Sequence, residues 1–398
     1  MVNLIPDILF VPAILQLILG LSSLAGGVEF FRYVKKRQKK QTLKFEGRVT
    51  VFVPCRGDES GLAENLRMIL QQDREDFEVI LIVDSAKDPA VAMIEELVSE
   101  HHFARLLVAG RAKGCGQKVH NLIKGVEAAD ESSVAYVFAD SDIRPSADWL
   151  RDLLAPLNEP ETGCSTGYRW FVQETGGFAT HMRASWNASI VSALGKRSDS
   201  NFAWGGSNAV RRNVFEELDI KGKWRGTVSD DFVITAAIRN SPYAIHFEPK
   251  CLTATLGDCS LVDLLEFTTR QMRITRVYSP GHFVVSLTGA LLFTLTFFPI
   301  AILAPFVSGW RSLALALIVA LIWMLGTAKS MVRIKAAAKC IPKYKNQLRI
   351  QYFAQMILWP FSSVLFVFND LAALVSRKIT WRGITYELVS DTETRILE

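Results

Sequence analysis

Long apolar stretches at both ends of the chain constrain its fold more than any other feature of the sequence. Residues 8–31 are almost entirely apolar, and three further apolar regions cover residues 282–307, 313–324 and 350–375. An apolar stretch of about 20 residues can cross a bilayer as a helix. The charged residues gather between these ends. We therefore expect a membrane protein in which a water-facing domain is inserted between an N-terminal anchor and C-terminal membrane segments.

Basic residues beside the apolar stretches predict their orientation. The basic run at residues 35–40 follows the first stretch and only Asp7 precedes it, which favours an uncleaved anchor over a cleaved signal peptide. A short turn at residues 309–311 would join the second and third regions as a hairpin, and a basic loop at residues 329–349 would follow. Because basic loops stay in the cytoplasm, we expect the inserted domain and this loop on the cytoplasmic side.

The fourth apolar region allows two topologies. Pro360 lies in its middle, and Asn369 and Asp370 lie further along it. If the region crosses the bilayer, the basic tail after it lies outside, against the charge rule. If it forms a re-entrant or interfacial helical pair, the tail stays inside, and this is the arrangement that we favour.

Composition and cysteine spacing exclude several classes of protein. The net charge is only +5, and no arginine-rich tail or basic-aromatic array indicates a nucleic-acid partner. The six cysteines form no C-x-x-C pair and the six histidines show no ligand spacing, so the sequence indicates neither a zinc site nor a redox dithiol. Scattered cysteines fit a reducing compartment. Charge on the cytoplasmic side of the membrane explains the small basic excess.

The middle of the chain alternates between strand and helix patterns. Strands are predicted at residues 49–54, 77–83, 104–108 and 134–139, and helices between them at residues 62–70, 89–101 and 118–129. Such alternation predicts a mostly parallel α/β sheet with helices on both faces. Ligands of such sheets bind beyond the carboxyl ends of the strands, so the residues that follow each strand are the candidates for a site.

These patterns divide the chain into consecutive segments. The stretch before the second apolar region places leucines on one face of a helix and therefore predicts an amphipathic interfacial helix. The expected segments are an anchor and basic linker at residues 1–40, a cytoplasmic α/β domain at 41–258, the amphipathic helix at 259–281, the C-terminal membrane segments at 282–376 and a tail at 377–398.

Two carboxylates after the fourth predicted strand are the strongest local signal. Asp140 and Asp142 are two residues apart and can reach one hard cation. Mg²⁺ and Mn²⁺ prefer such oxygen ligands and often bridge them to phosphates, whereas a capped turn would explain the same residues without a ligand. Asp84 ends another central strand and favours the first interpretation. We therefore expect magnesium or manganese as the cofactor, bound by Asp140 and Asp142.

Three further polar segments each allow two interpretations. The basic, glycine-bearing loop at residues 111–118 lacks P-loop spacing, so it either approaches a phosphate or is a solvated turn. Asp230 and Asp231 open a predicted helix, where acids are favoured by the helix dipole and could also provide a general base. Arg270 and Arg273 precede the second apolar region, where they would meet lipid headgroups or neutralise a diphosphate.

In this order, these residues resemble glycosyltransferase family 2, and most closely its ceramide glucosyltransferase and hopanoid-associated branch. The similarity covers nearly the whole chain, including the anchor and the C-terminal membrane cluster. The resemblance implies a GT-A fold and an inverting transfer from a nucleotide sugar to a lipid. The segments that carry it are Asp84, the loop with Lys118, Asp140-Ser141-Asp142, Asp230-Asp231 and Arg270-Gln271-Met272-Arg273.

The resemblance also implies roles on the donor side of the reaction. Asp84 would contact the nucleotide base, and Lys118 would also bind the nucleotide sugar. Asp140 would lie near the ribose and diphosphate, and Asp142 would bind the metal. Two residues, Arg270 and Arg273, match the two basic positions of the family's (Q/R)-x-x-R-W motif. Arg270 would also bind the donor.

On the acceptor side, Asp231 matches the acid that serves as the base in this family, and Asp230 stands where glutamate is commoner. Ile274 stands where the family has a tryptophan that helps to form the acceptor site. Further segments look like parts of the family: Trp204-Gly205-Gly206-Ser207 and Gly167-Tyr168-Arg169-Trp170 near the acceptor pocket, and Trp381-Arg382-Gly383-Ile384-Thr385-Tyr386, which resembles a C-terminal W-R-G-x-x-Y segment.

The activity that this resemblance implies is transfer of a sugar, foremost glucose from a UDP-linked donor, to the hydroxyl of a membrane lipid such as ceramide. The expected partners are the UDP-sugar, the lipid acceptor and the membrane. A processive polysaccharide synthase is an alternative, although Ile274 and the few membrane segments argue against it. An inactive membrane scaffold or lipid-binding protein is the alternative of another class.

Overall fold

The structure is a computed structural model that describes residues 4–59 and 61–397. The described chain divides into two compact units, which are considered separately below. The helical unit comprises Met1–Lys35, Val172–Ser192 and Gly257–Ser376, and the sheet unit comprises Lys36–Phe171, Ala193–Leu256 and Arg377–Glu398. The sheet unit thus includes the tail that we predicted as a separate segment, and it lacks residues 172–192 of the domain predicted at residues 41–258.

A mixed sheet lies at the centre of the sheet unit and has seven strands among the described residues. Strands β1 to β4 are parallel to one another, and the α/β prediction is confirmed. Antiparallel pairing of β6 with β4 and β5 was not predicted. The order is β3-β2-β1-β4-β6-β5-β7, for β1 (Val49–Pro54), β2 (Phe77–Val83), β3 (Ala104–Val108), β4 (Ala135–Ala139), β5 (Thr162–Val172), β6 (Ser207–Arg211) and β7 (Ala244–Leu256).

Helices pack against this sheet close to the predicted positions. Gly125 lets a helix approach the sheet, because a Cβ there would lie 2.6 Å from Ile82 Cδ1 and 2.8 Å from Phe52 Cδ1. The predicted helices correspond to α2 (Leu62–Leu70), α3 (Val91–Ser99) and α4 (Gln117–Glu127), and the others in this unit are α5 (Trp149–Leu154), η1 (Ala155–Asn158), α7 (Arg212–Glu217), α8 (Ile220–Trp224) and α9 (Asp230–Arg239).

The strand register brings distant polar segments to one edge of the sheet. Phe52 of β1 pairs with Ile80 of β2 and with Phe138 of β4, so the carboxyl ends of these three strands lie together. The antiparallel β6 begins at the same edge, since Ser207 pairs with Ala139. The segments after β1, β2 and β4 and the segment before β6 therefore converge.

The C-terminal tail forms a small antiparallel sheet within the sheet unit. Its order is β10-β9-β8, for β8 (Lys378–Trp381), β9 (Ile384–Leu388) and β10 (Thr394–Ile396). Ile379, Tyr386 and Leu388 are buried. A two-residue turn at Arg382 and Gly383 joins β8 to β9.

The helical unit contains the long apolar helices that the sequence predicts. Four helices among the described residues are long and apolar enough to cross a membrane. These correspond to α1 (Leu4–Lys39), α11 (Pro280–Leu303) with η2 (Ala304–Phe306), α12 (Trp310–Cys340), and η3 (Pro342–Tyr344) with α13 (Lys345–Val375). The unit also includes α6 (Phe178–Val191) and the predicted amphipathic helix, α10 (Leu261–Tyr278).

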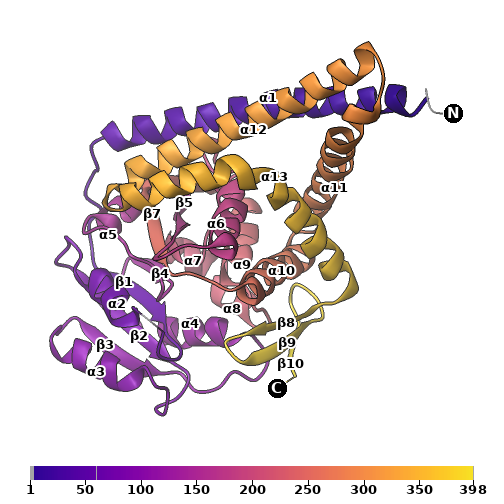
Figure 1. Ribbon diagram of the computed structural model, residues 1–398. Helices are drawn as coiled ribbons and strands as arrows, with labels where there is room; N and C mark the ends of the chain where they lie inside the picture. Colours follow the sequence, from indigo (N-terminus) through magenta and orange to yellow (C-terminus); the bar gives the residue numbers. More distant parts are fainter. Residues whose placement is uncertain (1–3, 60, 398) are drawn as a thin grey trace. The chain divides into compact units, whose positions relative to one another are not determined.

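The predicted basic loop at residues 329–349 is wrong, because α12 continues to Cys340, η3 follows at Pro342–Tyr344 and α13 begins at Lys345. Lys329 Nζ donates to Ser23 Oγ of α1 at 2.5 Å, and Arg333 Nη1 donates to the backbone oxygen of Ala188 at 3.0 Å. These basic residues therefore bind other helices of the unit. Figure 1 shows α12 running alongside α1.

The fourth apolar region is one continuous helix, α13, with Pro360 inside it. Figure 1 shows a change of direction along α13, as expected where a proline removes a helix hydrogen bond. Its polar residues face the unit: Asn369 Oδ1 accepts from Thr268 at 3.1 Å. The opposite face carries an exposed apolar stripe at helical spacing: Ile350, Phe353, Ile357, Phe361, Val364, Phe368, Leu371 and Val375.

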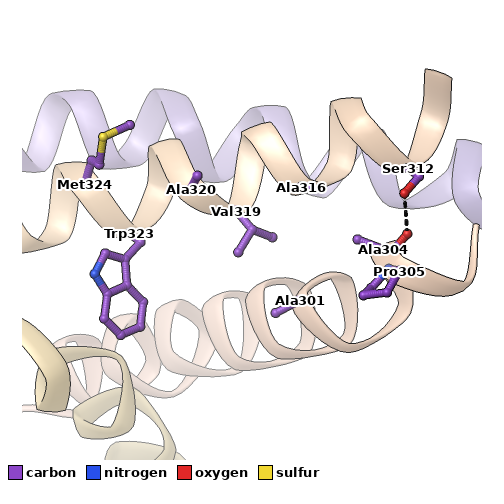
Figure 2. A pocket seen from close by; sticks show the side chains of 9 residues that line it. All are labelled: Ala301, Ala304, Pro305, Ser312, Ala316, Val319, Ala320, Trp323 and Met324. Carbon is purple, nitrogen blue, oxygen red and sulfur yellow. Dashed lines mark hydrogen bonds between the residues drawn. The ribbon is translucent and has the colours of Figure 1, made fainter.

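A mostly apolar pocket of about 480 Å³ lies near the turn that joins α11 and α12 (Figure 2). Alanines and Trp323 contribute much of its lining, and the hydroxyl of Ser312 donates to the backbone oxygen of Ala304 at 2.8 Å. This lining lacks the charged groups that would bind a nucleotide.

Candidate active site

Acidic and basic side chains gather at the carboxyl edge of the sheet. Asp140 and Asp142 follow β4, and Asp230 and Asp231 occupy the first turn of α9. Lys118, in the first turn of α4, lies between the two pairs. The structure thus brings together five of the residues that we predicted for the site.

Lys118 joins the two pairs of acids directly. Its Nζ lies 2.8 Å from Asp140 Oδ1 and 3.1 Å from Asp230 Oδ1, and it donates to the backbone oxygen of Gly205 at 3.3 Å. Although burial acts to lower the pKa of Lys118, the charges of Asp140, Asp230 and Asp231 raise it above its usual value. The lysine is therefore a fixed positive charge that uses its three N–H donors within the protein.

Arg169 of β5 binds both acids that follow β4, Asp140 and Asp142. Its Nη2 donates to Asp140 Oδ2 at 2.8 Å and its Nη1 to Asp142 Oδ2 at 3.3 Å, while its guanidinium lies over the Trp204 ring at 4.9 Å. Against the effect of burial, Lys118 and Arg169 hold the pKa of Asp140 below its usual range. Asp140 is therefore an ionised carboxylate between two cations.

Two glycines leave room for this cluster. A Cβ on Gly205 would lie 2.5 Å from Asp230 Oδ2 and 2.8 Å from Lys118 Nζ, and one on Gly206 would lie 2.7 Å from Asp140 Oδ2. The sequence assigned Trp204, Gly205 and Gly206 to the acceptor site. Their observed place is directly beside the carboxylates, where any larger residue would displace a charged group.

Asp230 and Asp231 are neighbours in sequence but have different environments. Asp231 Oδ2 accepts from the Gly205 N–H at 3.1 Å, and its Oδ1 accepts from the Ser229 hydroxyl at 2.5 Å. Asp230 is only 3% exposed and binds Lys118. Burial, with the charges of Asp231 and Asp140, raises the pKa of Asp230 to about 7, and Lys118 opposes this shift. Asp231 is thus the more accessible of the two acids and is held in one orientation.

Asp84 lies at the end of β2, at the same edge of the sheet. Its Oδ2 is 3.3 Å from Arg56 Nη1, and its side chain is 8% exposed. Arg56 follows β1, which explains the pairing, since β1 and β2 are parallel neighbours. The Asp84 carboxylate therefore has a cation beside it that we did not predict.

The carboxylates of Asp140 and Asp142 fit a divalent cation in their chemistry. Asp142 Oδ1 is buried and has no hydrogen-bond partner among the described residues. Within that part of the chain, no group of three or more His, Cys, Asp or Glu side chains could hold an ion. Two carboxylates suffice for Mg²⁺ or Mn²⁺ where substrate phosphates and water complete the shell. Arg169 bridges both carboxylates, so a bound cation would share them with this guanidinium.

The remaining predicted residues belong to the helical unit. Arg270, Arg273 and Ile274 lie on α10, whose N-terminus Ser260 and Asp263 stabilise as a capping box. The Arg270 guanidinium lies 5.8 Å from the Phe267 ring. The cluster of the sheet unit does not include these three residues, and their assigned roles stay predictions.

Sequence reasoning missed Arg169 and Arg56 as members of the cluster. Arg169 was part of a segment assigned to the acceptor pocket, but the strand that carries it, β5, was not predicted. For Arg56 a signal existed, because it follows the first predicted strand just as Asp84 follows the second. The rule that sites form beyond strand ends would have included it.

Two solved structures are similar to this chain. The mannosyltransferase PcManGT from Pyrobaculum calidifontis, in complex with GDP-Man and Mn²⁺, has a TM-score of 0.48 and 16% identity, with 92% of this chain and 98% of that chain covered. GalNAc-T7 with UDP, GalNAc and Mn²⁺ has a TM-score of 0.41 and 15% identity, with 60% of this chain and 52% of that chain covered.

A family comparison covers nearly the whole sequence. The family model described as glycosyl transferase family 21 matches residues 9–394. A ceramide glucosyltransferase from Komagataella phaffii is 33% identical over 109 residues, which are 25% of this chain and 21% of that relative's length. The resemblance to ceramide glucosyltransferases is confirmed, although the matching family is numbered 21 and not 2. The chain belongs to glycosyl transferase family 21.

Proposed function

We propose that this family member transfers a sugar from a nucleotide sugar to the hydroxyl of a membrane lipid, with inversion at the anomeric carbon. The observation that carries the proposal is the Asp231 carboxylate, which Gly205 and Ser229 hold in place beside the buried cations. A fixed carboxylate provides a base for the acceptor. The cations beside it offset the negative charge of the departing diphosphate. UDP-glucose and ceramide are the proposed donor and acceptor.

The proposed reaction is a single displacement. The lipid hydroxyl gives its proton to Asp231 as its oxygen attacks the anomeric carbon. The bond from that carbon to the diphosphate oxygen breaks, and the electron pair leaves with the nucleoside diphosphate. Lys118 and Arg169 are already positioned by their carboxylate partners, so their charges offset the developing negative charge without rearrangement. Asp84 contacts the base.

A divalent cation is part of the proposed donor site, held by Asp140 and Asp142, and its charge would stabilise the diphosphate. We expect Mn²⁺ to strengthen UDP binding to the wild-type protein and Asp142→Asn to remove this gain, a change of roughly tenfold or more because a bound divalent ion is worth several kcal/mol to a phosphate oxygen. Calorimetric titration with UDP, with and without Mn²⁺, measures the effect.

The control for Asp142 is Asp219→Asn, because Asp219 caps α8 through the Gly222 N–H. This variant should keep the full response to Mn²⁺. If Asp142→Asn also keeps it, Asp142 is not a ligand of the cation.

The path of the chain supports an α13 that does not cross the bilayer. The chain leaves the sheet unit after Leu256 and returns to it at Arg377. A water-facing unit lies on one side of the bilayer, so the segments between these points must cross an even number of times. The hairpin of α11 and α12 accounts for two crossings, and the continuous helix α13 therefore lies along one face of the bilayer, with its apolar stripe toward lipid. The basic run at residues 35–40 makes that face the cytoplasmic one.

This topology predicts which chain segments are accessible from outside the cell. An epitope inserted at Gly309, between α11 and α12, should be reached by antibody on intact cells. An epitope after Glu398 should be reached only after the membrane is permeabilised. Labelling of the C-terminal epitope on intact cells would show that α13 crosses.

Incubation of the full-length protein with radiolabelled nucleotide sugars and a membrane lipid extract tests the proposed function. A labelled glycolipid is the expected product, and its stereochemistry at the anomeric carbon should be opposite to that of the donor. A labelled polymer would instead indicate a polysaccharide synthase. Absence of any product across UDP-, GDP- and ADP-linked sugars would indicate an inactive scaffold or lipid-binding protein.

A further inference from the structure

The C-terminal hairpin of β8 and β9 contacts two loops of the candidate site. The buried Tyr386 hydroxyl accepts from the backbone N–H of Gln117 at 3.1 Å, one residue before Lys118. Arg382, in the turn, donates from Nη1 to the backbone oxygen of Arg56 at 2.9 Å and forms an ion pair with Glu59. Figure 1 shows the hairpin, in yellow, beside α4. The tail is therefore part of the wall around the site.

The turn holds Arg382 in an uncommon backbone conformation. Arg382 has φ 52° and Gly383 has φ 76°, as in the two-residue turns with positive φ that join antiparallel strands. Among the described residues, Asp219 is the other non-glycine residue with positive φ, and its side chain caps a helix. Asparagine and glycine favour this conformation, whereas an arginine there is uncommon and points to a functional constraint.

The Arg382 guanidinium has N–H groups available for a ligand. Both of its contacts use Nη1, and among the described residues Nε and Nη2 have no partner. The side chain is 27% exposed. Lys118, in contrast, already uses its three donors on Asp140, Asp230 and Gly205.

The charge of Arg382 acts on a group at the carboxyl end of β1. Burial raises the pKa of Cys55 to about 12, and Arg382 opposes this shift. Arg382 therefore contributes positive potential at this edge of the sheet.

We propose that Arg382 is a further donor-binding residue whose guanidinium contacts the diphosphate of the nucleotide sugar. The inference rests on the proposed function. A planar guanidinium presents two parallel N–H groups that match phosphate oxygens. The C-terminal tail, predicted as a separate segment, thereby becomes a component of the donor site, and Tyr386 positions it against α4.

Arg382→Asn separates binding from folding, because asparagine removes the charge but favours the positive φ of the turn. We expect Arg382→Asn to keep the thermal stability of the wild-type protein and to weaken UDP binding by about 10- to 100-fold, the range for a lost charge-assisted hydrogen bond. Uridine, which lacks phosphates, should bind both proteins equally. Arg382→Lys should be intermediate. Calorimetry on each full-length protein in detergent gives the dissociation constants of UDP and uridine.

Arg395→Ala is the matched control, since Arg395 lies on β10 of the same tail and its exposed side chain pairs with Glu393. It should bind UDP as the wild type does. If Arg382→Asn binds UDP like the wild type, or loses UDP and uridine binding equally, Arg382 does not contact the diphosphate and the inference fails alone. If the wild type binds none of UDP, GDP and ADP, the proposed function fails and the inference with it.

Discussion

Asp231→Asn is expected to lower kcat by roughly 10²- to 10⁴-fold, the usual contribution of a general base. The carboxylate is held by the Gly205 N–H and the Ser229 hydroxyl, and an asparagine side chain keeps the oxygen that accepts from the N–H of Phe232. The variant should therefore fold normally and lose only its ability to take a proton. Steady-state kinetics with saturating donor and lipid acceptor measure the change.

Donor binding distinguishes this role from a structural one. UDP should bind Asp231→Asn with the wild-type dissociation constant, because Lys118, Asp140 and Asp142 are unchanged. Ser229→Ala should give a smaller loss of kcat, since it removes one of the groups that orient the base. Near wild-type turnover in Asp231→Asn would exclude Asp231 as the base and would mean that another group accepts the proton.

Glu248→Ala should lower the free energy of unfolding by about 3–5 kcal/mol, the usual cost of removing one partner of a buried ion pair. The Glu248 side chain, on β7, is 2% exposed and binds Arg37 in the last turns of α1. Glu248 Oε1 also accepts from the backbone N–H of Lys250 at 3.2 Å. Thermal unfolding followed by circular dichroism would detect the loss.

Two variants control for the loss of charge alone. Glu393→Ala removes the exposed partner of Arg395; the Glu393 side chain is 56% exposed and that of Arg395 is 62% exposed. This variant should change the free energy of unfolding by less than about 1 kcal/mol. Glu248→Gln keeps the shape of the side chain and should be less harmful than Glu248→Ala. Equal effects of Glu248→Ala and Glu393→Ala would mean that the buried pair adds no stability.

The elements that sequence predicted best are those with a strong local pattern. β1 and β2 are runs of apolar residues buried along nearly their whole length, and α2 repeats its apolar residues at helical spacing. Strand ends then identified Asp84, Asp140 and Asp142 without knowledge of the sheet order, because ligands of α/β sheets bind at that edge. The interpretation as an enzyme site needed the whole ordered set of motifs.

The parts that sequence missed depend on contacts between distant segments. β7 carries Glu248, Pro249 and Lys250 in its middle, which interrupt any apolar pattern, and the buried ion pair with Arg37 compensates for the charge. Tyr386 meets Gln117 across 269 positions of sequence. No local periodicity predicts such a contact, so the tail could not be assigned to the α/β domain from the sequence.

The fourth apolar region shows a different limit. Pro360 suggested two helical pieces, yet α13 is continuous, because packing on both sides of the proline holds the helix together. Trp359 Nε1 donates to Thr327 Oγ1 at 3.3 Å, and the Phe361 ring lies 5.7 Å from that of Phe298. Along α13, polar residues are buried on one face and apolar residues are exposed on the other, which is the reverse of the pattern expected for a helix in water. α13 therefore exposes an apolar face of the kind that contacts lipid, which the proline alone does not predict.

The ion pair between Arg37 and Glu248 has a practical consequence for protein production. The last turn of α1 belongs to the sheet unit, which begins at Lys36, although the helix itself continues from the apolar anchor to Lys39. A soluble fragment cut after the basic run would lose Arg37 and bury Glu248 without this counter-charge. A fragment that contains the sheet unit should therefore begin before Lys36, so that it keeps Arg37 and the last turn of α1.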